Sequence, residues 1–188
     1  MLGEQLKTVP SGESGVYCMF DLDGEPAYAG RSSDLRSRLR QHFVRQDSSV
    51  VSYGRLDIWD IGRVDWWQTP HDKDAEEQLL AHYRPYLNFE EVTAVGDVKT
   101  HIDPTCPDDS VALASDDEQR FRSEPYNRTK QKLEHISRMV DKIKLSGHSD
   151  DTKRTLYEHE RILRENLAEF LDIDAPGEQS TLSIWDEE

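Results

Sequence analysis

Two short stretches decide the fold: GVYCMFD at residues 15–21 and EPAYAG at residues 25–30. The first is an apolar run rich in residues that favour β-strands, and Asp23-Gly24 follows it. Glycine tolerates the positive φ of a tight turn, so this pair predicts a hairpin whose second strand is residues 25–30. We therefore expect the sheet to begin with an antiparallel hairpin.

The segment after the hairpin predicts helices around a further strand. Residues 34–45 begin with an aspartate that can cap a helix, and their apolar side chains recur at helical spacing. Residues 62–69 (GRVDWWQT) have the composition of a third strand. A helix over residues 75–83 ends before Pro85, because the residue preceding a proline avoids the helical region.

Four parts follow from this pattern. Residues 1–95 predict an α/β (α+β) domain with a small three-stranded antiparallel sheet flanked by helices. Residues 96–117 hold two prolines and a run of acids without periodicity, which predicts an acidic linker. Apolar residues at helical spacing over residues 118–173, interrupted by a Ser-Gly break, predict a C-terminal helical hairpin. Residues 174–188 are predicted to be a flexible tail.

The charge of the chain is unevenly distributed. There are 38 acidic and 23 basic side chains, a formal net charge of -15, which disfavours indiscriminate binding to polyanions. Residues 28–46 nevertheless hold five arginines against one acid, and residues 120–144 hold eight basic residues against three acids. A local basic patch on an acidic body can bind a few phosphates while discouraging loose association.

The cysteines and the hydropathy favour an intracellular protein. Cys18 and Cys106 lie far apart and predict neither a zinc motif nor a disulfide framework. No apolar run approaches the roughly 20 residues that span a bilayer, and the N-terminus lacks the apolar core of a signal peptide. We expect a soluble, cytoplasmic protein that does not associate with membranes.

Several short motifs occur in a fixed order. They are Gly-Val-Tyr at residues 15–17, Tyr-Ala-Gly at residues 28–30, an arginine-bearing helix at residues 34–39, His42, and the glutamate-to-asparagine segment at residues 75–88. Each motif alone is weak evidence for a family. Together, in this order and on the expected secondary structures, the motifs resemble those of the GIY-YIG nuclease family.

The resemblance covers about Ser11–Phe89 and implies a metal-dependent endonuclease that hydrolyses phosphodiester bonds in DNA. Glu76 and Glu77 are adjacent, and the family spacing together with the predicted inner face of the helix selects Glu76 as the metal ligand. A single carboxylate can hold Mg²⁺ or Mn²⁺ with several retained waters, and the ion would polarise the phosphate.

By the same resemblance, Tyr17 activates the attacking water, with Tyr28 and His42 completing a hydrogen-bonded cluster. A phenol with a pKa near ~10 is a poor base, so a nearby cation must lower that pKa. We expect Arg38 to do this and to bind the phosphate. The predicted catalytic residues are Tyr17, Tyr28, Arg38, His42 and Glu76.

Other residues of this segment are predicted to bind substrate or to support the site. Arg31 is expected to contact phosphate or tyrosine. Arg36 and Arg40 lie on the same predicted helix as Arg38 and are further candidates for substrate binding, with a solvated helix face as the alternative. Gly30 and Asn88 are predicted to be structural, Asn88 by tying a helix end to the sheet.

The function has two readings at this stage. The first is an endonuclease, with structure-directed DNA repair favoured and RNA as an alternative substrate, because phosphate contacts do not distinguish the sugars. The second is a catalytically silent module that binds nucleic acid or a partner on the same scaffold. The presence of Tyr17, Arg38 and Glu76 together favours activity.

The predicted helical hairpin also has two readings. It can dimerise the chain or dock nucleic acid, or it can pack its apolar stripe on the nuclease domain as a lid. The first reading draws support from a set of basic residues: Arg120, Arg122, Arg128, Lys130 and Lys132.

The tail carries a short motif of its own. Gln179, Leu182, Ile184 and Trp185 resemble the box by which repair proteins dock on sliding clamps, in which a glutamine and an aliphatic-aromatic plug enter a preformed pocket. The motif departs from that pattern because Asp186 stands where a second aromatic is expected. Clamp binding is therefore a hypothesis, and a tail folded back on the body is the alternative.

Overall fold

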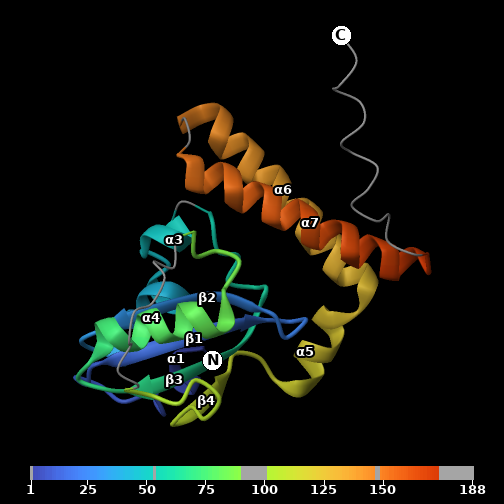
Figure 1. The fold of residues 1–188 in the computed structure, drawn as a ribbon. Helices are drawn as coiled ribbons and strands as arrows, with labels where there is room; N and C mark the ends of the chain where they lie inside the picture. The colour runs from blue at the N-terminus through green and yellow to red at the C-terminus, as the bar shows by residue number, and fades with distance from the viewer. Residues whose placement is uncertain (1, 53, 90–100, 147–148, 174–188) are drawn as a thin grey trace.

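A computed structural model describes residues 2–52, 54–89, 101–146 and 149–173 of the chain. A four-stranded antiparallel sheet with the order β2-β1-β3-β4 forms the centre of the N-terminal domain, and a long helical hairpin lies against that domain (Figure 1). The strands are β1 (Gly15–Asp21), β2 (Pro26–Ser32), β3 (Ile61–Gln68) and β4 (Asp109–Ala112).

Local sequence signals account for the helix ends. The Asp34 side chain accepts a hydrogen bond from the backbone N–H of Ser37 at 3.0 Å and so caps the helix that carries Arg38. Arg84 ends the helix before Pro85 in a left-handed conformation, with φ of 49°. The helices are α1 (Leu2–Gln5), α2 (Leu35–Arg40), a π-helical turn η1 (Gln41–Arg45), α3 (Ser49–Ser52), α4 (Asp72–Tyr83), α5 (Asp116–Ser123), α6 (Pro125–Ser146) and α7 (Asp150–Leu171).

Every residue of the inner strand β1 is buried, because both faces of the sheet are covered. Tyr17 and Met19 point into one core cluster, which includes Leu35 of α2. Val16, Cys18 and Phe20 point into the other, which α4 covers. The strand is therefore a continuous apolar run, without the polar alternation typical of a sheet with one solvated face.

The predicted fold class is confirmed, with one additional strand. The structure contains the antiparallel sheet, the flanking helices and the C-terminal helical hairpin, but the sheet has four strands where three were expected. β4 lies within residues 96–117, the predicted linker. Only Val111 of its four residues is buried, so the strand leaves no hydrophobic period in the sequence.

The described part of that predicted linker packs on the domain. The indole Nε1 of Trp67 donates hydrogen bonds to the carbonyl oxygens of Asp103 and Cys106, at 2.8 and 3.0 Å. Ile102 is buried in the core cluster that α4 covers. Residues 101–114 therefore pack on the domain, because an acidic segment can be anchored through its backbone and a few apolar side chains while its acidic side chains face solvent.

The helical hairpin is held on the domain by buried ion pairs. Arg128 and Lys132 of α6 both bind the buried carboxylate of Asp60, and Arg128 also binds Asp23 in the β1–β2 turn. His159 of α7 bonds through Nε2 to the carbonyl oxygen of Arg55 at 3.0 Å. The hairpin thus packs on the domain, but through polar contacts rather than through the apolar stripe that the lid reading expects, of which Leu133 and Val140 are exposed.

This packing corrects the expected role of two of the basic residues. The sequence places Arg128 and Lys132 among the residues that could dock nucleic acid, but both side chains are buried and neutralised by carboxylates.

Among the helices of the described residues, none has the length and apolarity needed to cross a bilayer. The four residues of the clamp-like motif lie outside the described residues.

Candidate active site

Tyr17 and His42 form the buried centre of the candidate site. Tyr17 comes from the middle of β1 and His42 from η1, and neither side chain is exposed to solvent. The phenol oxygen lies 2.8 Å from His42 Nε2, while His42 Nδ1 lies 2.9 Å from the hydroxyl of Ser48. Both ring nitrogens are therefore hydrogen-bonded, which fixes the orientation of the imidazole.

β2 supplies the second tyrosine and the glycine that makes room for the first. Tyr28 lies beside both rings, with centroid distances of 6.4 Å to Tyr17 and 5.9 Å to His42. Gly30 is the register partner of Tyr17, and a Cβ at this position would lie 2.6 Å from the Tyr17 hydroxyl. Gly30 is thus required because the phenol lies against its backbone, which gives its predicted structural role a physical reason.

Arg38 of α2 is the cation of the cluster. Its guanidinium lies near enough to Tyr17 and Tyr28 for its positive charge to act on the pKa of both phenols. Nη1 donates to Gln41 Oε1 at 3.0 Å, and the buried Nε has no hydrogen-bond partner among the described residues. A guanidinium that faces neutral phenols rather than a carboxylate is suited to receive an anion.

Burial determines the protonation of the tyrosine–histidine pair. It raises the pKa of Tyr17 far above that of a free phenol; the neighbouring Tyr28 adds to this effect, and Arg38 opposes it. Arg38 lowers the pKa of this phenol, as expected, but desolvation outweighs the nearby charge, so the net pKa of Tyr17 stays above that of a free phenol. Burial, followed by the charge of Arg38, also lowers the pKa of His42 to about 3, so both rings are neutral near pH 7.

Glu76 of α4 lies beside this cluster. Its side chain is 24% exposed, its charge acts on the pKa of both Tyr17 and Tyr28, and Arg31 Nε donates to its Oε2 at 2.8 Å. Arg31 also lies 3.5 Å from Asp72, so in this structure it binds two carboxylates. The adjacent Glu77 is exposed, in agreement with the choice of Glu76.

The donor set around Glu76 limits the kind of metal site that the fold can offer. No group of three or more His, Cys, Asp or Glu side chains suited to a metal occurs within the part of the chain that the structure describes. A caged zinc or calcium centre is therefore not built from these residues. One partly exposed carboxylate fits an ion such as Mg²⁺, which keeps most of its waters when bound to protein.

Two predicted substrate-binding arginines face the N-terminal segment instead. Arg36 donates from Nε to the carbonyl oxygen of Val9 at 2.6 Å and from Nη2 to that of Lys7 at 2.8 Å. Arg40 is exposed and lies beside Gly3 of α1. The structure thus assigns Arg36 to holding the N-terminal segment, a correction that the sequence could not supply because no motif marks residues 7–9 as its partner.

Asn88 lies where the sequence places it, between the end of α4 and the sheet. Its Oδ1 accepts from the N–H of Ala29 at 2.8 Å and its Nδ2 donates to the Ala29 carbonyl at 3.0 Å. Both bonds occupy the outer edge of β2, next to Tyr28 and Gly30. Sequence reasoning missed the partners that orient the catalytic candidates, Ser48, Gln41 and Asp72, because none stands at a fixed distance from a motif.

Comparison with known proteins identifies this part of the chain. Residues 13–89 match the family model described as "UvrC-like GIY-YIG domain". These residues form a GIY-YIG domain. The resemblance predicted from the short motifs is therefore confirmed over the segment that carries the candidate site.

Curated relatives of the GIY-YIG domain agree with this assignment. UvrABC system protein C of Shewanella loihica is 35% identical over 86 residues, which are 44% of this chain and 14% of the relative. The protein of the same name from Caldicellulosiruptor saccharolyticus is 34% identical over 90 residues, 46% of this chain and 15% of the relative. The match thus spans only about one seventh of these relatives. No solved structure matches the chain.

Proposed function

We propose that the GIY-YIG domain is a metal-dependent endonuclease that hydrolyses phosphodiester bonds in DNA, with DNA repair as its setting. The observation that carries this proposal is the placement of Arg38. A cation without a carboxylate partner in the described residues lies against the Tyr17–His42 pair, and Glu76 is close enough to influence both tyrosines. An anion-binding group, a proton carrier and a metal ligand thus share one site.

Each side chain has a definable part in this reaction. Arg38 binds the phosphate and stabilises the charge that develops on it. Tyr17 stays protonated in the resting site, so it acts as a proton carrier rather than as a preformed phenolate. When Tyr17 donates to His42 Nε2, its oxygen keeps lone pairs that can accept a proton from water while its own proton moves to the imidazole.

Glu76 would hold the divalent cation, which when bound supplies positive charge at the scissile phosphate. The ion pair with Arg31 keeps the carboxylate in place beside the phenols. Asp72, bound to the same guanidinium, restrains Arg31 from the preceding turn of α4. Arg31 is thus proposed to position Glu76, in addition to the phosphate contact expected from the sequence.

A nicking assay with two adjacent variants tests this proposal. Wild type, Glu76→Gln and Glu77→Gln are incubated with supercoiled plasmid and Mg²⁺ or Mn²⁺, with and without a chelator. Glu76→Gln is expected to lower the rate by about 10²-fold or more, because the charge of a bound metal is worth several kcal/mol. Glu77→Gln removes the same charge from an exposed position and should change the rate by less than about twofold. Metal-dependent cleavage that survives Glu76→Gln contradicts the mechanism.

The second candidate function is a binding module that does not cut. It is favoured by the Arg31–Glu76 ion pair, which already neutralises the proposed metal ligand. This alternative predicts that the folded wild type retains nucleic acid in a shift assay but leaves plasmid, branched DNA and RNA uncut with either metal. Cleavage of RNA and not DNA would instead change the substrate while keeping the chemistry.

A further inference from the structure

The helical hairpin holds the loop that follows α3 through one contact from each of its helices. His159 of α7 bonds through Nε2 to the carbonyl oxygen of Arg55 at 3.0 Å. Lys142 of α6 donates from Nζ to the carbonyl oxygen of Ser52, the last residue of α3, at 2.8 Å. The hairpin therefore fixes the backbone that carries Arg55.

The guanidinium of Arg55 lies at the edge of β2, next to Tyr28. Its Nη2 donates to the carbonyl oxygen of Leu87 at 3.0 Å, and the backbone N–H of Leu87 donates to the carbonyl oxygen of Ala27, the residue before Tyr28. Burial raises the pKa of Tyr28, and the charges of Arg38 and, more weakly, Arg55 lower it. Arg55 is thus a second cation of the candidate active site, although no motif marks it.

Arg154 of α7 adds a further cation beside Arg55. Both guanidiniums lie over the ring of Phe89, at 5.9 and 5.5 Å from its centroid. Asp151 lies 3.6 Å from Arg55, and Asp150 is paired at 2.7 Å with the lysine three residues further on. Arg154 is exposed and forms no ion pair within the described ranges. The two arginines therefore share one carboxylate, which leaves positive charge available to an anion.

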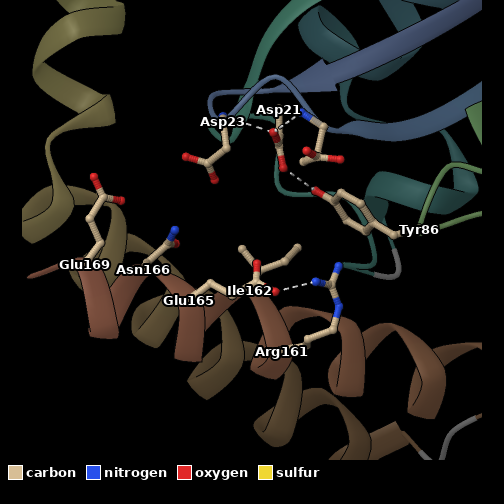
Figure 2. A pocket seen from close by; sticks show the side chains of 9 residues that line it. Asp21, Asp23, Tyr86, Arg161, Ile162, Glu165, Asn166 and Glu169 are labelled. Atoms are coloured by element: carbon tan, nitrogen blue, oxygen red, sulfur yellow. Dashed lines mark hydrogen bonds and ion pairs between the residues drawn. The ribbon is translucent and has the colours of Figure 1, made fainter. Parts of the chain in front are cut away.

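The C-terminal half of α7 meets the domain in the opposite electrostatic setting. Figure 2 shows carboxylates from both sides around a cavity of about 420 Å³, namely Asp21, Asp23, Glu165 and Glu169. Arg161, the basic residue of this lining, is already paired with Glu158 and Glu165. Such a surface repels a polyanion, so the charges along α7 favour a polyanion at its N-terminal half.

The chemistry of the proposed substrate matches this arrangement. A nucleic-acid strand carries one phosphate charge per nucleotide, spaced about 3.4 Å along the axis of a duplex. A strand whose scissile phosphate lies at Arg38 therefore brings further phosphates to cations beside the site. Contacts of this kind position a substrate without reading its sequence.

We propose that Arg55 and Arg154 bind phosphates that flank the scissile phosphate, so that the helical hairpin forms part of the DNA-binding surface. Arg154 comes from outside residues 13–89, the segment that matches the GIY-YIG domain. The role of this surface rests on the proposed function, because it takes Arg38 to bind the scissile phosphate.

Fluorescence anisotropy of a labelled forked DNA duplex, with a chelator present to prevent cleavage, tests the proposal on the full chain. Wild type should bind saturably, with an affinity that falls as salt rises from about 50 to 200 mM. Arg154→Gln should bind about threefold more weakly and reduce the slope of log affinity against log salt by about 0.7–0.9, the value of one phosphate contact. Arg164→Gln, the matched control, removes the same charge from an exposed position of α7 that is paired with Glu160, and it should keep the wild-type slope.

The outcomes separate a phosphate contact from a general effect of charge. Equal slopes for Arg154→Gln and Arg164→Gln would overturn the proposal, as would a wild type that does not bind the duplex. Arg154 is exposed, so this comparison does not depend on a variant that alters the core. Arg55→Gln/Arg154→Gln should lose about twice the slope of the single variant, and a double variant with the slope of Arg154→Gln would remove Arg55 from the surface.

Binding and cleavage fail separately. A wild type that binds with the expected slopes but leaves plasmid uncut with Mg²⁺ or Mn²⁺ supports this surface and contradicts the nuclease. A wild type that cuts plasmid while Arg154→Gln binds as Arg164→Gln does supports the nuclease and overturns the role of the hairpin.

Discussion

Two polar clusters of this molecule differ in how their charges are paired. At the seam between the domain and the hairpin, Arg128 and Lys132 converge on the carboxylate of Asp60. At the candidate active site, Arg38 faces Tyr17 and Tyr28, which are neutral, and its Nε has no partner in the described residues. The seam matches its cations with anions, whereas the site leaves its cation unmatched.

This difference separates a structural cluster from a functional one. Burying a charge is unfavourable unless an opposite charge and hydrogen bonds compensate, and the seam meets that condition. An unmatched guanidinium is tolerated at a site when a ligand anion is to complete it. Breaking the seam should therefore impair folding and leave the chemistry of the folded protein intact, and breaking the site should do the reverse.

The largest expected effect is on stability, at the seam. Asp60→Asn leaves Arg128 and Lys132 buried without their shared anion and should lower the free energy of unfolding by about 3–5 kcal/mol. Urea denaturation followed by circular dichroism measures this change. Asp47→Asn, at an exposed aspartate 3.6 Å from Arg45, is the control and should change stability by less than about 1 kcal/mol. A seam variant as stable as the control would show that these ion pairs do not hold the hairpin.

The next largest effect is on catalysis, at the site. Arg38→Gln removes the anion-binding group and should slow plasmid cleavage by about 10²–10³-fold, a range typical of losing one donor to a transition-state anion. Stability should change little, because no carboxylate loses a partner. Arg40→Gln, on the exposed side of α2, should leave both rate and stability near wild type. Equal rates in the two variants would remove Arg38 from the reaction.

The sequence alone predicts much of this site, because its motifs lie on neighbouring elements. Tyr17 and Gly30 stand in boxes on paired strands, so their register brings the phenol over the glycine. Arg38 and His42 are four residues apart, one helical turn, which places both beside Tyr17. Local periodicity and strand pairing carry this information, and both can be read from a single chain.

The remaining features depend on tertiary packing that no short pattern encodes. The pKa of Tyr17 rises because the whole domain excludes water from the phenol, an effect larger than the single cation that the sequence identifies. Asp60 and Arg128 are separated by 68 residues, and no spacing rule joins them. The sequence pattern does not predict β4, because backbone pairing, rather than side-chain burial, holds its four residues.

Gly30→Ala should disturb the site more moderately. The added Cβ would lie 2.6 Å from the Tyr17 hydroxyl, so the phenol must shift and its bond to His42 must lengthen. Overpacking of this kind lowers the free energy of unfolding by about 1–3 kcal/mol. Cleavage should fall with it, because the proton path runs through that bond. Gly62→Ala, in strand β3, is the control, because an added Cβ there meets its nearest atom at 3.4 Å, an ordinary van der Waals contact.

The smallest expected effect is the dependence of stability on pH. Buried histidines cause it, and the site and the seam hold different numbers of them. Burial lowers the pKa of His42 at the site to about 3, that of His135 at the seam to about 4, and that of His159 well below its usual value. The unfolded chain takes up these protons near pH 6.5 and the folded chain does not, so stability is full above pH 6.5 and is lost as the pH falls toward the folded values.

Each such histidine should lower the free energy of unfolding by about 1.4 kcal/mol between pH 7.5 and pH 5.5. His42→Gln and His135→Gln should each remove the loss of stability that comes from one histidine. The free energy of unfolding, measured with urea at the two pH values, should therefore differ less for each variant than for wild type. His82→Gln, which removes an exposed histidine, is the matched control. If His42→Gln loses as much stability on acidification as wild type, the folded protein protonates His42 between these two pH values, and burial does not keep this ring neutral at pH 5.5.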